Sequence, residues 1–417
     1  MCLEGPFADD LCSLHNISEH SATTPLVIWI PPFSFCDGYD PASILPPRWL
    51  QQFPIATINY RWPGLFLGPE DSTVSRVINR PPAASPTPLH WPTPLHDILF
   101  GYRWILEHLA PPELARRDIY VYGSYLGASL AASLALTEAQ SHEPMAVRGL
   151  IAYNGIYNWT TFLPDHPINR PKDVSKGKKK KTLAALDTPS TDLQNKGSPF
   201  HLLRQQAPLL FHDPSHLFDP FASAALLFHT SGLAVPSDFH RDTSLLPSDF
   251  TSAVNALSAG SPLISKPTSE QAEPLVKATR KAYLTFPPRK SSLQIPPTLL
   301  LYDPVPTPAS RTRKSTASRR RAASGANSFQ SQANDLAGAM IRSVEVHELR
   351  DRMKWDETLE DPDLLAEEAK RRVRLAQVGE DSEDGAEAGL GVLDLNGAGE
   401  EAAGDWLRAR VEGEDEY

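Results

Sequence analysis

The sequence predicts an α/β fold with a doubly wound, mostly parallel sheet, because two patterns alternate along it. Continuous apolar runs such as PLVIWI at Pro25–Ile30 are typical of strands that are buried on both faces. Segments such as Thr93–Leu109 instead repeat apolar residues at helical spacing behind a Thr-Pro start. Strands that alternate with helices imply right-handed crossovers, and these crossovers make neighbouring strands parallel.

Further elements continue this alternation on both sides of a long irregular stretch. Strands are expected at Ile55–Tyr60, Asp118–Tyr122, Val147–Tyr153, Pro296–Asp303 and SVEVHEL (343–349). Helices are expected at Ser129–Ala139, around Asn334–Met340 and near Leu364–Val378, where Glu367 and Glu368 precede Arg371 and Arg372 by four residues. The chain is long enough for one large α/β domain with insertions.

Composition divides the chain into a core and three irregular parts. Residues 1–160 are expected to form the N-terminal half of the core, and residues 293–378 its C-terminal half with a basic insertion at 307–330. Residues 161–292 are rich in Pro, Ser and Lys, which predicts a cap or insertion that is partly helical and partly disordered. Residues 379–417 are acidic and rich in Gly and Ala, the composition of a disordered tail with room for one short helix around Trp406.

Charge and cysteine content favour a cytoplasmic protein that does not bind nucleic acid. The net charge of −10 argues against a nucleic-acid-binding surface. Cys2, Cys12 and Cys36 lack metal-ligand spacing, and their odd number favours a reducing compartment. The first 20 residues do not resemble a signal peptide, and no run of about 18 apolar residues predicts a membrane span. Basic clusters at Lys176–Lys181 and Arg311–Arg321 keep nuclear localisation open as an alternative.

The segment DIYVYGSYLGASLAASLAL (118–136) has the layout of a nucleophile elbow, a sharp strand-to-helix turn that glycines permit. With VIWIPPFSFCDG, INYRWPG and HWPTPLHDILFGYRWILEHL in matching order and spacing, it resembles the α/β-hydrolase superfamily of the hormone-sensitive-lipase-like esterase and lipase type. The resemblance covers residues 25–160 and, more loosely, 293–360. It implies an α/β-hydrolase fold, whose active members cleave carboxylic esters with a Ser-His-acid triad.

Carried over residue by residue, the resemblance implies a degenerate nucleophile elbow. The elbow reads Gly123, Ser124, Tyr125, Leu126, Gly127, so Tyr125 stands where the family has its nucleophilic serine. A phenol is too bulky for the attack geometry and titrates at roughly pH 10. Ser124 lies one position early, where the turn is expected to aim its side chain away from the cleft.

The oxyanion loop of the family, usually His-Gly-Gly-Gly, is replaced as well. Pro31, Pro32, Phe33 and Ser34 stand in its place, and the two prolines lack backbone N–H donors. We therefore expect weaker stabilisation of an oxyanion at this loop. Cys36 follows closely and is interpreted as an inert buried thiol, because no partner base is identified for it.

The acid and the histidine of the triad are displaced in the same alignment. The family's acid would fall near Pro306, where Asp303 is the nearest carboxylate. The family's histidine, counted from a strand through His347, would fall at Met353–Trp355, where the sequence reads Met-Lys-Trp. Serine, base, acid and oxyanion donors are thus each absent or displaced.

We therefore expect an α/β-hydrolase-fold protein that is catalytically degenerate and acts as a binding or interaction module. Its elbow and pocket would consist of Gly123, Ser124, Tyr125, Gly127 and Phe33, without metal or cofactor, and its ligand would be a small molecule or a protein. Tyr125 is then either a plug or a ligand contact in a retained cavity. The alternative is a divergent carboxylic-ester hydrolase in which Ser124 acts with a cap histidine: His201, His212, His216, His229 or His240.

Overall fold

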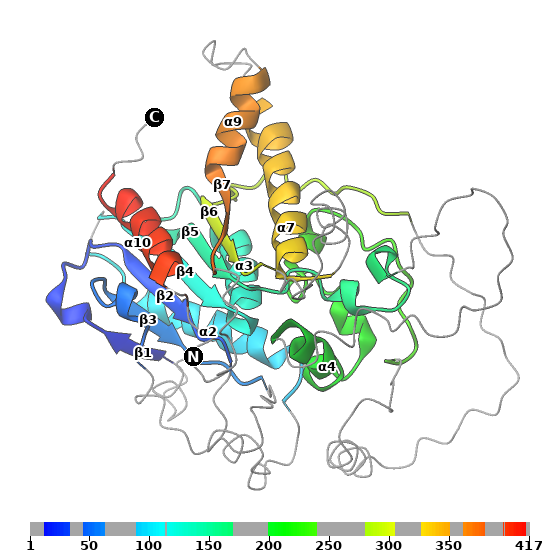
Figure 1. Ribbon diagram of the computed structural model, residues 1–417. Coiled ribbons are helices and arrows are strands. Elements are labelled where there is room, and N and C mark those ends of the chain that lie inside the picture. Colours follow the sequence, from blue (N-terminus) through cyan, green and yellow to red (C-terminus); the bar gives the residue numbers. More distant parts are fainter. Residues whose placement is uncertain are drawn as a thin grey trace, which may run out of the picture.

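The computed structural model describes residues 12–33, 45–62, 89–112, 115–169, 199–239, 280–304, 327–350, 362–379, 395 and 397–413. Their centre is a seven-stranded sheet with the order β1-β3-β2-β4-β5-β6-β7 (Figure 1). β1 pairs antiparallel with β3, and the other described pairs are parallel. The predicted α/β fold with a mostly parallel sheet is therefore confirmed.

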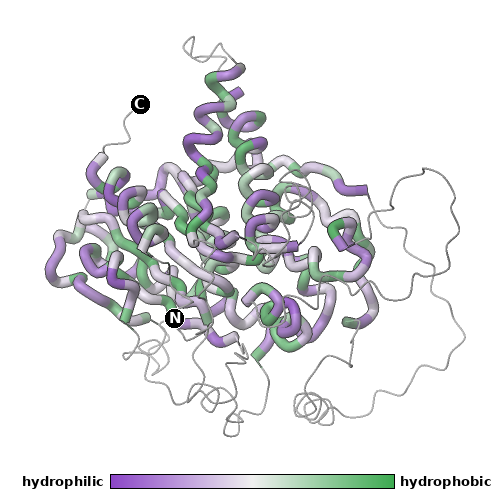
Figure 2. The backbone as a smooth tube through the Cα atoms, viewed as in Figure 1, coloured by the Kyte–Doolittle hydropathy of each residue, from purple (hydrophilic) through white to green (hydrophobic). Residues whose placement is uncertain are grey.

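β2 to β6 agree with the predicted strands to within a few residues, whereas β1 was not predicted and the C-terminal edge differs. Every residue of β2 and β3 is buried, as expected where helices or loops cover both faces of a sheet. Figure 2 shows hydrophobic residues concentrated along these central strands. The strands are β1 (Cys12–His15), β2 (Leu26–Ile30), β3 (Ile55–Ile58), β4 (Arg117–Ser124), β5 (Met145–Tyr153), β6 (Thr298–Tyr302) and β7 (Val373–Gln377).

The helices cover both faces of this sheet. Figure 1 shows α10 in front of the strands and the fainter α3 behind them. The helix α3 contains mostly Ala, Ser, Leu and Gly, so it approaches β4 and β5 closely with almost every residue buried. The α-helices are α2 (Thr93–His108), α3 (Leu126–Glu138), α4 (Pro199–Phe211), α7 (Phe329–Ser343), α9 (Pro362–Arg372) and α10 (Gly397–Val411). Short 3-10 helices are η1 (Ile17–Glu19), η3 (Arg48–Leu50), η4 (Trp159–Phe162), η5 (Pro167–Asn169), η7 (Pro214–Phe218) and η8 (Ala224–Leu227).

The segment SVEVHEL, predicted to be a strand, is helical. It continues α7 as the π-helical turn η10 (Val344–Leu349). Its alternating pattern was misleading because no turn residue separates it from α7, and Leu336, Met340 and Val344 recur every four residues with fully buried side chains. Helical spacing therefore outweighs the short alternation.

The predicted final helix near Leu364–Val378 is a helix followed by a strand. The helix α9 ends at Arg372, and β7 then pairs in parallel with β6 at the edge of the sheet. The ion pairs differ from the expected pairs at four-residue spacing: Arg371 binds Glu368, three positions earlier, and the Arg372 side chain binds Glu348 of η10. The change from helix to strand was missed because Val-Arg-Leu-Ala-Gln fits either structure in isolation.

Of residues 161–292, predicted to be a cap or insertion, the structure describes 161–169, 199–239 and 280–292. They contain α4 and the short helices η7 and η8. The end of α4 closes an aromatic cluster with the core, in which Trp62 lies 5.4 Å from Phe211 and Trp159 lies 5.0 Å from it, measured between ring centroids. The lysine run at residues 176–181 and the basic insertion around residues 311–321 lie outside the described residues.

Residues 379–417 were predicted to be a disordered tail, and for residues 397–411 this is wrong. They form α10, which packs on the sheet through Trp406, whose ring lies edge-on 6.4 Å from Tyr120. The guanidinium of Arg410 stacks on the other side of this indole, 3.8 Å from the ring centre. The expected short helix around Trp406 is thus longer than predicted and belongs to the core. Within the described ranges, no helix is long and apolar enough to cross a membrane.

Truncation of Trp406 is expected to destabilise the whole domain. Its side chain is 5% exposed and contacts Tyr120, so Trp406→Ala should lower the free energy of unfolding by about 3–5 kcal/mol. Phe100→Ala is the matched control, because Phe100 of α2 is 62% exposed and its loss should change stability by less than about 0.5 kcal/mol. Urea unfolding monitored by circular dichroism measures both. If Trp406→Ala were as stable as the wild type, α10 would not contribute to the stability of the core.

Candidate functional site

The turn from β4 to α3 has the geometry of a nucleophile elbow. Tyr125 is the single residue between strand and helix, and its φ of 51° and ψ of −114° are a conformation that non-glycine residues rarely adopt. The glycines on either side permit this turn, because a Cβ on Gly127 would overlap the carbonyl oxygens of Ile30 and Pro31, and one on Gly123 would overlap the backbone of Gly127. Tyr125 therefore occupies the position of the nucleophile in this type of turn.

The Tyr125 side chain is completely enclosed, with 0% exposure. Its ring stacks on Phe33 at 5.9 Å between centroids with an interplanar angle of 30°. It meets Tyr153 edge-on at 5.8 Å and Phe329, at the start of α7, at 5.6 Å. Phe329 in turn contacts Phe200 of the cap helix α4 at 5.1 Å. The space above the elbow is thus filled by aromatic rings from the core and the cap.

A polar network joins the Tyr125 hydroxyl to the end of β6. Asn154 Nδ2 donates to the Tyr125 hydroxyl at 3.3 Å and to Asp303 Oδ2 at 2.8 Å, and the Asp303 N–H donates to Asn154 Oδ1 at 3.0 Å. The Tyr153 hydroxyl donates to the same Asp303 oxygen at 2.8 Å. Burial raises the pKa of Asp303, although these two hydrogen bonds oppose the shift. Burial also raises the pKa of Tyr153.

Asn154 was not recognised as a site residue from the sequence. It has a φ of 51°, and asparagine tolerates this left-handed conformation better than most residues. The Tyr-Asn-Gly sequence at the end of β5 is a turn signal that could have identified it.

The backbone donor next to Tyr125 is already bonded within the protein. In this type of elbow, the N–H of the residue after the nucleophile stabilises the oxyanion. Here that residue is Leu126, and its N–H donates to the carbonyl oxygen of Pro32 at 3.2 Å. Pro31 and Pro32 supply no N–H of their own. Ser34 and Cys36 lie outside the described residues.

Ser124 is the last residue of β4 and is 1% exposed. Side chains alternate between the two faces of a strand, so Ser124 shares the face of Tyr120 and Tyr122. That face is covered by Trp406 of α10 and by Trp49, whose ring lies 5.0 Å from Tyr122. The hydrogen bonds that described histidines make go to groups other than the Ser124 side chain.

The predicted position of the triad histidine, Met353–Trp355, was counted from a strand at SVEVHEL, which is helical. Met353–Trp355 itself lies outside the described residues. Gly379, after β7, has a φ of 96° and lies beside Asp303, since a Cβ added to it would be 3.0 Å from Asp303 Oδ1. His347 is the last histidine in the sequence.

Two residues of the family-like motifs meet in the structure. Arg61, from INYRWPG, binds Asp97 of α2 through its backbone N–H at 2.9 Å, its Nε at 3.1 Å and its terminal nitrogen at 2.7 Å. The hydrogen bonds to Asp97 raise the pKa of Arg61. Asp97 is buried, so this bidentate pair fixes the loop after β3 against the helix that precedes the elbow strand.

The described cap histidines have partners away from Ser124. His201 lies 3.0 Å from Gln205, His212 stacks on His90 and His216 bonds to a backbone carbonyl. His229 is 2% exposed, and its Nε2 lies 3.4 Å from Asp335 Oδ2. His240 lies outside the described residues.

Asp335 of α7 joins the cap to the core. It lies 3.4 Å from Lys281 as well as from His229. Burial raises the pKa of Asp335, but the nearby His229 and the charge of Lys281 outweigh burial and lower the pKa to about 2. No group of three or more ligating side chains within the described residues could hold a metal ion.

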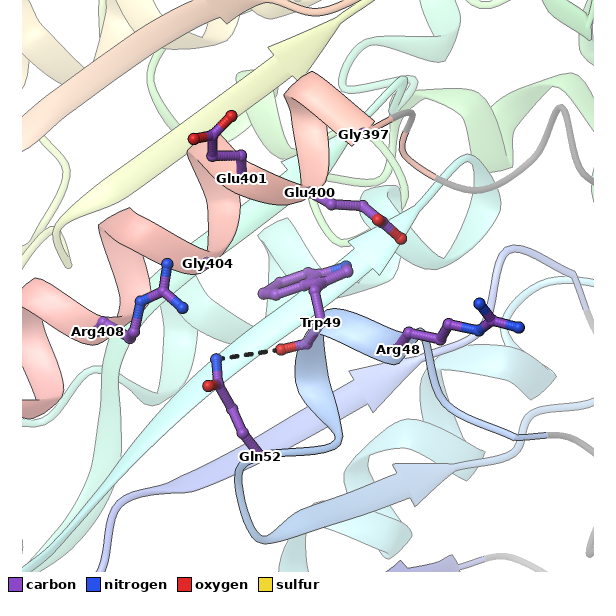
Figure 3. A pocket seen from close by; sticks show the side chains of 8 residues that line it. All are labelled: Arg48, Trp49, Gln52, Gly397, Glu400, Glu401, Gly404 and Arg408. Carbon is purple, nitrogen blue, oxygen red and sulfur yellow. Dashed lines mark hydrogen bonds between the residues drawn. The ribbon is translucent and has the colours of Figure 1, made fainter.

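A separate open groove of about 310 Å³ lies between η3 and α10 (Figure 3). Figure 3 shows the Trp49 indole on its floor, with Glu400 and Glu401 on the α10 side. Trp49 Nε1 is buried without a hydrogen-bond partner among the described residues. The groove therefore lies on the Tyr122 face of the sheet, away from the Tyr125 ring.

The fold and the elbow together define the class of this protein. A parallel sheet whose central strand leads through a positive-φ residue into a buried small-residue helix is the architecture of the α/β-hydrolase fold, and this chain has that fold. No family model and no curated protein matches the chain.

Solved structures of esterases and lipases are similar to this chain at low identity. Carboxyl esterase 2 from the mycorrhizal fungus Tuber melanosporum is 12% identical over 96% of this chain and 80% of that chain, with a TM-score of 0.39. A hormone-sensitive lipase from a metagenome library is 12% identical over 93% and 78%, with a TM-score of 0.38. The esterase of the archaeon Pyrobaculum calidifontis is 14% identical over 49% and 53%, with a TM-score of 0.27. At these values the likeness adds nothing about activity.

The elbow glycine should be intolerant of the smallest substitution. Gly127→Ala places a Cβ onto two backbone oxygens that cannot move independently, so we expect a loss of about 3 kcal/mol of stability or more. Gly338→Ala is the matched control, because Gly338 of α7 has open space around it and alanine favours helices by up to about 1 kcal/mol. The melting temperature should fall for Gly127→Ala and rise slightly for Gly338→Ala. An unchanged melting temperature for Gly127→Ala would contradict the close approach of α3 to the end of β2.

The Asp335 cluster predicts a defined acid sensitivity. A carboxyl whose pKa is lower in the folded state stabilises the fold above its unfolded pKa of 3.8, and this contribution is lost as the pH falls towards 2. Asp335→Asn should therefore flatten the fall in stability between pH 4 and pH 2, about the range that the two pKa values span. Asp165→Asn, at an exposed position, is the control and should retain the wild-type slope. Identical slopes for all three proteins would exclude the ion-pair cluster as the cause.

Proposed function

We propose that this protein is a catalytically degenerate α/β-hydrolase-fold protein that acts as a binding or interaction module. The observation that carries the proposal is Tyr125, which holds the backbone conformation of the nucleophile while its side chain is 0% exposed. An enzyme of this class needs a small nucleophile that an ester can reach. A buried phenol held by an asparagine amide fills that position instead and acts as a plug.

Two further features support the proposal. The Leu126 N–H, which would stabilise an oxyanion, is bonded to Pro32. Asp303, the carboxylate nearest to the position of the family's acid, accepts hydrogen bonds from Tyr153 and Asn154. Each feature removes a different part of the acyl-transfer machinery.

A divergent carboxylic-ester hydrolase that uses Ser124 is the alternative. It is favoured by one observation, the position of a serine directly beside the elbow. This serine is 1% exposed, so the reaction would require the sheet face at Trp49 and Trp406 to open. A triad would also require a histidine to move to it.

Covalent labelling distinguishes the two functions. Purified protein is treated with a fluorophosphonate probe and assayed with short p-nitrophenyl esters, as wild type, Ser124→Ala and Tyr125→Ala. We expect no labelling and no turnover above the uncatalysed rate in any variant, because Ser124 is 1% exposed and Tyr125 occupies the nucleophile position. Labelling or turnover in the wild type that is lost in Ser124→Ala but retained in Tyr125→Ala would establish the displaced serine hydrolase and overturn the proposal.

A further inference from the structure

Small residues of α10 leave the groove between η3 and α10 open. Gly397 and Gly404 line it, and a Cβ added to Gly397 would have no described atom from another part of the chain within 4 Å. The nearest side chain to a Cβ on Gly404 would be Arg408, at 3.8 Å. The groove of about 310 Å³ is therefore not filled from the helix side, and it has room for a small ligand or one long side chain.

An indole ring forms the floor of this groove. Figure 3 shows the Trp49 ring beneath the turn of α10 that carries Glu400 and Gly404. On the core side the ring meets Tyr122 almost perpendicularly, with an interplanar angle of 75°. The face of an indole attracts a cation more strongly than any other aromatic side chain does. The floor of the groove is therefore suited to a positively charged group.

A second tryptophan on the same side of the sheet already binds a cation in this way. The guanidinium of Arg410 lies 3.8 Å from the ring centre of Trp406, which packs on Tyr120. The other cation–π contact of the described residues is made by Tyr283. Within the described part of the chain, Trp49 has no such cation of its own.

The charges that line the groove leave negative charge beside the indole. Glu400 and Glu401 form part of the α10 wall, and neither makes an ion pair within the described ranges. Arg408 is paired with Asp405, three residues earlier in the helix. Figure 3 shows the Arg48 side chain extending away from the indole. A cation on the ring would therefore meet two carboxylates that have no other partner there.

The indole nitrogen of Trp49 adds a further requirement. It is buried and makes no hydrogen bond with any described residue. A buried donor without an acceptor is unfavourable, so a ligand with an oxygen beside its cationic group would bind better than a bare cation. The groove thus combines an aromatic face, two carboxylates and an unpartnered donor.

We propose that this groove binds an organic cation, an ammonium or guanidinium group that lies over Trp49 and is neutralised by Glu400 and Glu401, with an acceptor oxygen at the indole N–H. Two sources carry this chemistry. One is a free small amine with a hydroxyl group, and the other is a basic side chain of a protein with its peptide carbonyl. The groove lies on the Tyr122 face of the sheet, so the site is independent of Tyr125 and of ester hydrolysis.

Isothermal titration calorimetry on the full-length protein tests the site. Choline represents the free amine, and N-acetyl-arginine amide represents the basic side chain. We expect saturable binding with a dissociation constant of about 1 mM for at least one probe, and the probe that binds more tightly identifies the source. Glu400→Gln should weaken binding by about tenfold or more, because it removes a charged acceptor. Arg48→Gln should leave binding unchanged or tighten it, because it removes a charge of the same sign as the ligand.

Two further variants separate binding from folding. Gly404→Leu fills the groove without changing its charge and should abolish binding, with the circular dichroism spectrum of the wild type. Glu107→Gln, at an exposed carboxylate of α2 that pairs with Arg103, is the matched control and should bind as the wild type does.

Three results would overturn the proposal. The first is the absence of saturable binding of both probes up to about 20 mM, roughly twenty times the expected dissociation constant. The second is an equal affinity of the wild type and Glu400→Gln. The third is a loss of binding in Arg48→Gln that Glu400→Gln does not show, which would indicate a site for anions.

Discussion

The close approach of α3 to the end of β2 is the constraint on which the rest of the site depends. Gly127 lies against the carbonyl groups of Ile30 and Pro31, and this contact leaves no room for a side chain. It forces residue 125 into a positive φ at the top of the sheet. Whatever residue stands there must point into the space between core and cap. A change of chemistry at this position therefore leaves the backbone of the elbow intact.

Tyr125 makes that space part of the hydrophobic core. Its ring contacts Phe33, Tyr153 and Phe329, and through Phe329 the packing extends to Phe200 of the cap. Active sites usually sacrifice packing for access. In this protein the residue at that position packs against its neighbours. The cap is attached to the core by this packing at the elbow and by hydrogen bonds from Trp62 and Trp91 to the Leu210 carbonyl at the end of α4.

The sequence was sufficient to predict β2 to β6 and the position of the elbow, because buried parallel strands and a glycine-flanked turn leave local signals. It was insufficient at both edges of the sheet, since the short strand β1 was not predicted and the C-terminal edge was assigned wrongly. SVEVHEL alternates like a strand but is helical and extends α7. The β7 sequence follows a helix without a break in its pattern, yet it forms the edge strand that pairs with β6. Which of the two segments pairs with β6 depends on tertiary contacts that the local sequence does not reveal. The expected histidine position at Met353–Trp355 was counted from a strand at SVEVHEL, so it loses its basis.

Contacts between residues that lie far apart in the sequence could not be predicted from local sequence patterns either. Asn154 and Asp303 are 149 positions apart in the sequence, and they meet because β5 and β6 are neighbouring strands. The role of α10 was underestimated for the same reason, since its acidic, glycine-rich composition is outweighed by the burial of Trp406 against Tyr120. Composition describes the average of a segment, so it does not reveal that one large side chain, Trp406, is buried against the sheet.

The bond from the Leu126 N–H to Pro32 has a consequence for redesign of the elbow. Replacing Tyr125 by serine would supply a small hydroxyl at the turn but would leave the neighbouring N–H bonded to the Pro32 carbonyl oxygen. The same change would remove the ring that contacts Phe33, Tyr153 and Phe329, and so would open a void between core and cap. An engineer would therefore have to rebuild the Pro31–Pro32 loop and the neighbouring packing together with the elbow residue.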